Sequence, residues 1–287
     1  MMRSDSMRKR VSASPIHIAI VDPDPRMAVL AVLLKPRLAV TVAASAAEAL
    51  AALKHLAPHI VIVNVDLPDL RGGEFCRILR ARFPGCPIVV VTGVESSENL
   101  REVTDLPLDG FFRKPVRTDQ LIEHLAALLA SPAAFPRLNG YVGRAIEHVA
   151  GAYDRSLRLS SVAQAVGVSR THLAHLFKAQ TGVTLGEFIL KLRIEISTRL
   201  LTHTDDKLEC IAETVGFSDG PHFSRMFYRL VGRWPGHFRQ MAKARGIAAY
   251  CAMQDSRTVI HKTHTAPYCS MPTVRRSSVE EQHPSTP

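Results

Sequence analysis

The chain has 287 residues, of which 46% are hydrophobic and 22% are charged, a balance typical of globular proteins and not of disordered or fibrous ones. At roughly 100–200 residues per domain, this length favours two domains. The net charge of +10 is uneven, because residues 14–130 carry 12 basic and 13 acidic side chains whereas residues 140–242 carry 13 and 9. The second half is therefore the half suited to a polyanionic partner.

No apolar stretch approaches the ~20 residues of a membrane span, so we expect a cytoplasmic protein with no membrane partner. The five cysteines form no C-x-x-C pair, which favours a reduced chain. Cys76 and Cys86 could sense oxidants, although buried structural thiols are commoner. The sequence has no phosphate-cradling glycine-rich loop, no H-E-x-x-H and no G-x-S-x-G motif, so an enzyme is the weakest interpretation.

Four short apolar runs rich in Ile and Val predict strands buried on both faces, at 16–21, 60–65, 87–91 and, more weakly, 111–112. Helix-like stretches alternate with them, at 27–34, 46–56, 73–82 and 119–130. This alternation indicates a parallel sheet with helices on both faces. Because ligands of such folds bind beyond the carboxyl ends of the strands, Asp22, Asn64 and Thr92 should surround one pocket.

The motifs IAIVDPDP, PHIVIVNVDLPDLRG, VVVTG and FFRKPV over 15–130 resemble, in this order, the receiver domain of two-component response regulators. The resemblance implies a flavodoxin-like, doubly wound α/β fold with a parallel five-stranded sheet. It also assigns the positions of the receiver pocket. Asp22 matches the first acid, Thr92 the hydroxyl, Lys114 the lysine and Phe111 the aromatic switch.

Two positions depart from the receiver pattern. Pro23 occupies the second acid position, and Asn64 occupies the phosphoacceptor position. An amide cannot form an acyl phosphate, and Mg²⁺ prefers anionic oxygens, so we expect neither phosphorylation nor a cofactor, and Mg²⁺ binding is doubtful. Asp66 could face the same side as Asn64 but is better interpreted as a loop acid. Asp24 is interpreted as a solvated loop residue that could partly replace the missing acid.

A connector and a tail frame the second half. The segment SPAAFP at 131–136 contains two prolines, which predicts a linker over 131–139 between domains at 14–130 and 140–242. Periodicity fades from about Ala242 onward, and the end, TVRRSSVEEQHPSTP, is polar and rich in Pro and Ser, so we expect residues 243–287 to be disordered. Four possible zinc ligands lie there with a spacing that matches no usual finger, so no metal site is predicted: Cys251, His261, His264 and Cys269.

Residues 162–182 and 211–232 form an internal repeat, VAQAVGVSRTHLAHLFKAQTG and IAETVGFSDGPHFSRMFYRLVG, with one inserted residue in the second copy. Each copy predicts a short helix ending at a glycine, Gly167 or Gly216, that allows a left-handed turn. A serine, Ser169 or Ser218, should then cap the next helix. This pattern is typical of a helix-turn-helix, whose second helix enters the major groove of DNA.

Apolar side chains at helical spacing predict the buried face of each second helix: Leu173, Leu176 and Phe177, then Phe223, Met226 and Phe227. The opposite faces are the candidate DNA-binding residues: Arg170, Thr171, Ala174, His175 and Lys178, then Gly220, Pro221, His222 and Arg225. Residues 185–201 predict one amphipathic helix between the copies. A fixed spacing near one DNA turn, ~34 Å, would let both helices read adjacent grooves.

Residues 140–240 resemble the AraC/XylS-type DNA-binding domain, most clearly through IAETVGFSDGPHFSRMFYRLVGRWPGHFR in the second copy. The resemblance implies double-stranded DNA and RNA polymerase as partners, and activation rather than repression. It aligns six residues with base-reading positions: Thr171, Ala174 and His175, then Pro221, His222 and Arg225.

Each candidate has an alternative interpretation. Arg225 could be a surface ion-pair partner, although we favour contact with a phosphate or a guanine. His175 and His222 could be ordinary exposed histidines, and Ala174 could touch a thymine methyl group or nothing. Arg170, Lys178 and Arg229 could contact phosphate or form a solvated face. Pro221 lies in the first helical turn, where proline is tolerated.

The leading interpretation is a sequence-specific transcription regulator whose receiver-like domain is gated by dimerisation, a partner or a ligand instead of phosphate, with a homodimer formed through that domain. A conventional phosphorylation-gated response regulator is the alternative, and Asn64 argues against it. A signalling adaptor acting through protein contacts is the alternative from another class.

Overall fold

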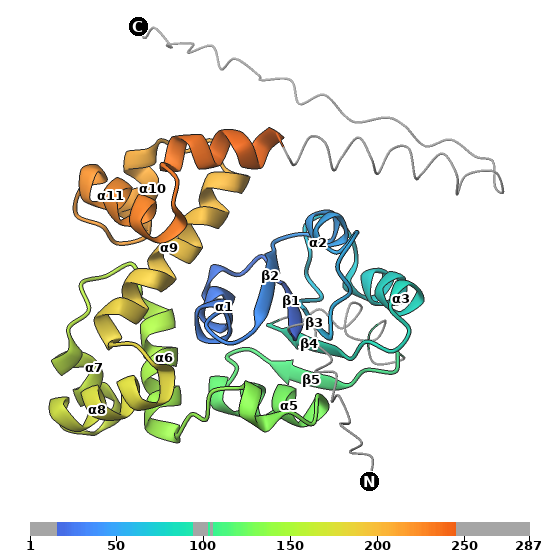
Figure 1. Cartoon of the computed structure of the whole chain (residues 1–287), viewed down its shortest axis with the longest axis horizontal. Helices are drawn as coiled ribbons and strands as arrows, with labels where there is room; N and C mark the ends of the chain where they lie inside the picture. Colours follow the sequence, from blue (N-terminus) through green and yellow to red (C-terminus); the bar gives the residue numbers. More distant parts are fainter. Residues whose placement is uncertain (1–15, 94–102, 104–105, 245–287) are drawn as a thin grey trace, which may run out of the picture. The chain divides into compact units, whose positions relative to one another are not determined.

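The structure, a computed structural model, describes residues 16–93, 103 and 106–244 (Figure 1). Its first half contains one five-stranded parallel sheet with the strand order β2-β1-β3-β4-β5. The strands are β1 (His17–Val21), β2 (Ala39–Ala43), β3 (Ile60–Val63), β4 (Ile88–Thr92) and β5 (Gly110–Arg113). This is the predicted doubly wound fold.

Strand residues alternate between two hydrophobic layers, as the period of an extended chain requires. On one face, Ile18, Ile20 and neighbouring strand residues pack with α1 (Ala28–Leu34) and α5 (Thr118–Leu128). On the other, Ala19 and Val21 pack with α2 (Ala46–Ala52) and α3 (Gly72–Arg82). Figure 1 shows these helix pairs on opposite sides of the sheet. The carboxyl ends of β1, β3 and β4 consequently meet at one edge.

The predicted elements are present, with shifted ends. The strands at 16–21, 60–65 and 87–91 are β1, β3 and β4, each displaced or shortened by one or two residues. The strand β2 was missed, because its sequence AVTVA is short and only its last residue is fully buried. The tail predicted to be disordered over 243–287 begins within a helix that continues to residue 244, and the rest of it, including its Cys and His residues, lies outside the described part of the chain.

The second half is helical. A 3-10 turn, η2 (Pro132–Ala134), precedes α6 (Gly140–Ala152). Two helix pairs follow, α7 (Leu159–Val166) with α8 (Arg170–Thr181), and α10 (Leu208–Thr214) with α11 (Gly220–Val231). The helix α9 (Leu185–His203) joins the pairs, and helical residues continue over 235–244. No described helix is long and apolar enough to cross a membrane.

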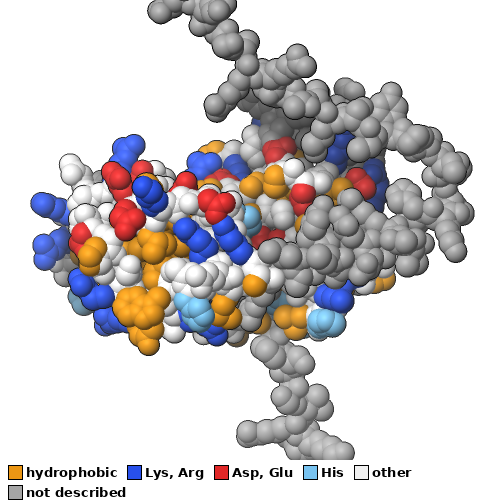
Figure 2. Space-filling view, turned by 90° about the horizontal axis from the view of Figure 1, so that it is seen from above, with side chains coloured by type: hydrophobic (Ala, Val, Ile, Leu, Met, Phe, Trp, Pro, Cys, Tyr) orange, Lys and Arg blue, Asp and Glu red, His pale blue; other side chains and the backbone are white. Residues whose placement is uncertain are grey.

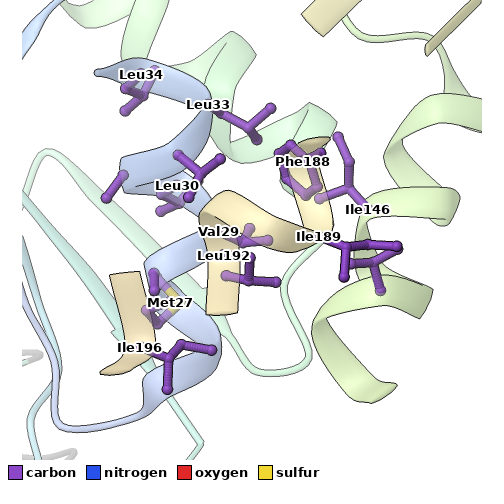
Figure 3. Packing of buried hydrophobic residues seen from close by; sticks show 14 of the residues in the cluster. Met27, Val29, Leu30, Leu33, Leu34, Ile146, Phe188, Ile189, Leu192 and Ile196 are labelled. Carbon is purple, nitrogen blue, oxygen red and sulfur yellow. The ribbon is translucent and has the colours of Figure 1, made fainter. Parts of the chain in front are cut away.

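The helix α1 packs against α9 as well as against the sheet (Figure 3). Every residue of its sequence AVLAVLL is buried. A helix that is apolar all round must be covered on all sides, and α9 supplies the outer cover. Figure 3 shows Val29 of α1 beside Leu192 of α9, and Met27, just before α1, beside Ile196 of α9.

Polar contacts surround this apolar seam, the packed residues of α1 and α9. Lys35 Nζ lies 2.5 Å from Glu195 Oε2. His203 Nε2 lies 3.1 Å from Glu48 Oε2. Arg199 Nη1 donates to the carbonyl oxygen of Asp24 at 3.0 Å, and Arg199 Nη2 donates to that of Asp22. The helix between the two helix pairs is therefore bonded to the loop that follows β1.

Candidate nucleic-acid interface

The first helix pair has the predicted helix-turn-helix geometry. Gly167 ends α7 in the left-handed conformation at φ +76°. Ser169 then begins α8, and its hydroxyl accepts a hydrogen bond from His172 N at 3.2 Å. Leu173 and Phe177 are fully buried. These contacts fix α8 with its opposite face directed outward.

The second pair repeats this geometry with one change. Gly216 adopts φ +86°, as predicted, but Ser218 does not cap α11. The cap is Asp219, whose Oδ1 accepts from His222 N at 2.6 Å. The prediction of a serine cap is wrong here because the inserted residue delays the start of α11 by one position. An Asp and a Ser are both good caps, so the helix begins equally well.

Most candidate DNA-binding residues are exposed, and Ala174 and Gly220 are half-buried. Among the described residues, no ion pair or side-chain hydrogen bond engages Arg170, Lys178, Arg225 or Arg229. The interpretation of Arg225 as a surface ion-pair partner therefore finds no partner in this part of the chain. Figure 2 shows one face of the molecule, on which Lys and Arg side chains lie among hydrophobic and acidic groups. Exposed cations without a described partner, such as Arg170 and Arg225, are groups that attract phosphate oxygens.

The two recognition histidines differ in their surroundings. The ring of His222 packs edge-on against Phe217, with the ring centroids 5.5 Å apart. His175 has no described ring contact. Pro221 lies in the first turn of α11 and does not break it. The side chain of His222 is therefore held beside the turn, whereas that of His175 projects from an exposed position.

The receiver pocket lies at the carboxyl ends of β1, β3 and β4, as predicted. Asp22, Asn64 and Thr92 are all buried there. Asn64 Nδ2 donates to Asp22 Oδ1 at 3.0 Å, and Lys114 Nζ lies 2.7 Å from Asp22 Oδ2. Burial raises the pKa of Asp22 above its ordinary value, and the Lys114 ammonium opposes that shift. The buried Asp22 carboxylate is thus already held by an amide and an ammonium.

Asp24 belongs to this pocket, and its interpretation as a solvated loop residue is wrong. Its Oδ2 lies 3.2 Å from Lys114 Nζ and 3.0 Å from Arg26 Nη2. Although burial opposes the shift, hydrogen bonds from Arg26 lower the pKa of Asp24 to about 2. Pro23 between the two acids is exposed, so its ring turns away from the buried pocket. Asp24 supplies a second carboxylate, already paired with two cations.

The remaining receiver positions are also placed. Asp66 is half-buried, and its backbone N–H donates to Asn64 Oδ1 at 3.1 Å. Phe111 is 41% exposed on the edge strand β5. Cys76 and Cys86 are buried, and burial raises the pKa of each thiol to about 11. Such thiols carry little thiolate at neutral pH, which supports their interpretation as structural residues.

Sequence analysis missed two arginines of α9, Arg193 and Arg199. Both donate to backbone carbonyls far away in the sequence, Arg193 within the helical half and Arg199 across to the first half. The available signal was weak: both arginines interrupt an amphipathic helix beside strongly apolar positions such as Leu192 and Ile196.

In comparisons with known proteins, the chain matches the models of two domain families. The response regulator receiver domain matches residues 18–126, and a helix-turn-helix domain matches residues 162–241. The transcriptional regulatory protein HptR of Staphylococcus aureus is 22% identical over 217 residues, covering 68% of this chain and 85% of its own.

Two further relatives match a little over a third of the chain. The Msm operon regulatory protein of Streptococcus mutans is 32% identical over 100 residues, 35% of this chain and 36% of its own. The C-terminal domain of AraT, a response regulator from Geobacillus stearothermophilus, is 30% identical with a TM-score of 0.36, covering 37% of this chain and 88% of that one.

The chain spans only 36%, 32% and 46% of the length of the first three curated relatives that it matches. The matches nevertheless cover both halves of the described chain with distinct families. The chain thus joins a response regulator receiver domain to an AraC-type helix-turn-helix domain.

Proposed function

We propose that this protein is a sequence-specific, DNA-binding transcription regulator whose receiver domain works without phosphorylation. The observation that carries the first part is the pair of helix-turn-helix units on one helix, with exposed cations that have no described partner on both recognition helices. Helices of this kind read base edges in the major groove, while their Lys and Arg side chains contact phosphates.

The direction of regulation rests on the relatives. One of them, 33% identical over 113 residues, is named the HTH-type transcriptional activator RhaR of Klebsiella pneumoniae. We therefore favour activation, with RNA polymerase as the protein partner at the promoter and the cytoplasm as the compartment.

Selection from a random-sequence duplex library by the full-length protein tests the DNA-binding proposal. We expect a bipartite motif whose halves are about 10–10.5 base pairs apart, one turn of DNA. Affinity should fall steeply with salt, with a slope near −0.9 for each phosphate that the protein neutralises. Weak binding without sequence enrichment would contradict the proposal and favour an adaptor that acts through protein contacts.

The second part of the proposal rests on the pocket. Acyl phosphate formation needs a carboxylate where Asn64 stands, and Asn64 instead donates to Asp22. Mg²⁺ prefers anionic oxygens, but the carboxylates of Asp22 and Asp24 both lie against the Lys114 ammonium. A pocket already neutralised by its own lysine fits Mg²⁺ poorly, and we propose that no cofactor is bound there.

A small-molecule phosphodonor such as acetyl phosphate, added with Mg²⁺, tests this part. We expect no acid-labile label on the wild-type receiver by intact-mass measurement. The Asn64→Asp variant is the matched comparison, because it restores the carboxylate at an otherwise unchanged position. Label on the wild-type chain, for example at Asp66, would overturn the proposal.

Signals must then reach the DNA-binding half by another route. Arg199 ties α9 to the carbonyls of Asp22 and Asp24, so a ligand, partner or dimer that moves this loop would act directly on α9. We propose that dimerisation through the receiver is one such input, supported by Phe111, which is exposed on β5, the edge strand of the sheet among the described residues.

Sedimentation of the full-length protein tests the dimer. We expect a concentration-dependent dimer that Phe111→Asp weakens. A wild-type protein that stays monomeric at every concentration would exclude this input and leave a ligand or a partner protein.

A further inference from the structure

The Arg193 guanidinium is fully engaged with backbone. Its Nε donates to the carbonyl oxygen of Tyr153 at 2.8 Å, its Nη1 to that of Gly216 at 2.7 Å, and its Nη2 to that of Arg155 at 2.7 Å. The guanidinium carbon also lies 5.8 Å from the centroid of the Phe217 ring. All three nitrogens and one face of the group are therefore used, in a fork geometry that lysine cannot reproduce.

These carbonyls belong to different recognition units. Tyr153 and Arg155 lie in the connection between α6 and α7, which supports the first helix-turn-helix. Gly216 is the turn of the second. Arg193 itself lies near the middle of α9, the helix that both units share. Arg193 thus hydrogen-bonds both to the turn of the second unit and to the α6–α7 connection that supports the first unit.

The two turn glycines show that this contact is special to the second unit. A Cβ added at Gly216 would lie 2.6 Å from the Asp154 carbonyl oxygen and 2.9 Å from Arg193 Nη2. A Cβ added at Gly167 would meet nothing within 4 Å. Both glycines have similar positive φ values, +86° and +76°. The backbone of the second turn is therefore pressed against the first unit, while the first turn is open.

We propose that Arg193 is a positioning residue that fixes the relative orientation of the two recognition helices, so that the protein tolerates only one spacing of half-sites. The inference rests on the proposed two-groove reading of DNA.

The physical reason is preorganisation. Two linked binding modules gain affinity when their fixed geometry matches the spacing of their sites, and the gain falls when that geometry loosens. Without Arg193, the units would still be joined by α9, but the second turn could shift against the first unit. Each recognition face would remain unchanged, because Arg193 lies on neither α8 nor α11.

The test uses the full-length protein and the duplex that it enriches from the random library. Three duplexes are compared: the intact site, the site with one base pair inserted between its halves, and the site with one half scrambled. We expect Arg193→Met to lower affinity for the intact site about 10-fold while binding to the half-scrambled duplex stays unchanged. The penalty for the insertion should shrink at least several-fold.

Gly216→Ala and Gly167→Ala form a matched pair. Both place a Cβ at positive φ, so they share the backbone strain. Only Gly216→Ala also displaces the contact with Asp154 and Arg193. We expect Gly216→Ala to reproduce the loss of spacing discrimination, and Gly167→Ala to retain the wild-type insertion penalty whatever it costs in stability.

The outcomes separate the two proposals. An unchanged insertion penalty in Arg193→Met, or an equal loss on intact and half-scrambled duplexes, would overturn the role of Arg193. Where Arg193→Met does not fold, Arg193→Lys and Gly216→Ala replace it; if these also lack the folded state, the residue is merely structural and the inference is wrong. A wild-type protein with no spacing preference would instead contradict the two-groove reading.

Discussion

The receiver pocket and the recognition helices hold their charges in opposite ways. In the pocket, Asp22 and Asp24 are held by Lys114, so cation and acids satisfy one another. On the recognition helices, Arg170 and Arg225 are exposed without a described partner. The difference shows which half is built to meet an external charge: the pocket has little left to offer a phosphate or a metal ion, whereas the helices offer unpaired cations.

Removing the pocket cation should have the largest effect. Lys114→Met leaves the buried Asp22 carboxylate, 1% exposed, without its cationic partner, and we expect the free energy of unfolding to fall by about 3–5 kcal/mol at pH 7. Urea unfolding measures it. The double variant Lys114→Met, Asp22→Asn should recover most of the loss, because it removes the uncompensated charge. A change within about 0.5 kcal/mol would mean that the pocket is not self-neutralised.

Removing a cation from a recognition helix should weaken DNA binding and leave the stability of the protein nearly unchanged. Arg225→Ala should leave the free energy of unfolding within about 0.5 kcal/mol, because the side chain is exposed and unpaired. Its binding free energy for the selected duplex should weaken by about 1–3 kcal/mol, roughly a 5- to 150-fold loss of affinity. Fluorescence anisotropy measures both the loss and the salt slope. Arg37→Ala, an exposed receiver arginine, is the matched control and should bind as wild type does.

Helix caps sharpen the comparison between the two recognition units. Asp219→Ala should cost about 0.5–2 kcal/mol of stability, because it removes the acceptor for the His222 backbone N–H. Ser169→Ala should cost a similar amount in the first unit. Ser218→Ala should change thermal stability little, since Ser218 caps nothing. A larger effect of Ser218→Ala than of Asp219→Ala would contradict the observed start of α11.

The smallest effect concerns the seam between α9 and the first half. A hydrogen bond to Glu48 raises the pKa of His203, and burial and the Arg199 guanidinium oppose the shift. Because the folded pKa is raised, this stabilisation is complete below the unfolded value of about 6.5 and is lost as pH rises through the folded pKa.

Since 38% of the His203 side chain is exposed, solvent screening should limit the effect to a few tenths of a kcal/mol. Unfolding free energies from about pH 6 to about pH 8.5 check it, with His203→Gln expected to flatten this component. If the free energy of unfolding of the wild type instead rose over this pH range relative to that of His203→Gln, the prediction would be wrong.

Periodic features were predictable from the sequence. The buried Leu173, Phe177, Phe223 and Phe227 follow directly from helical spacing within the repeat. The left-handed turns at Gly167 and Gly216 were predictable because glycine adopts a positive φ without steric cost. Asn64 and Pro23 were recognisable as departures because they sit beside otherwise matching motifs.

Three features were not predictable from the sequence. The cap at Asp219 depends on where the second copy accommodates its one inserted residue, and the spacing of the repeat does not determine that position. The packing of α1 against α9 had a signal, the uninterrupted AVLAVLL, but nothing in it identified the covering helix. The partners of Arg193 and Arg199 are carbonyl groups, which every residue carries, so no side-chain pattern marks them.

Binding of the full-length protein to its selected duplex, with and without acetyl phosphate and Mg²⁺, tests the central claim most directly. We predict a specific, steeply salt-dependent complex whose affinity is the same under both conditions. A complex that forms or tightens only with the phosphodonor, or the absence of any specific complex, would contradict the account.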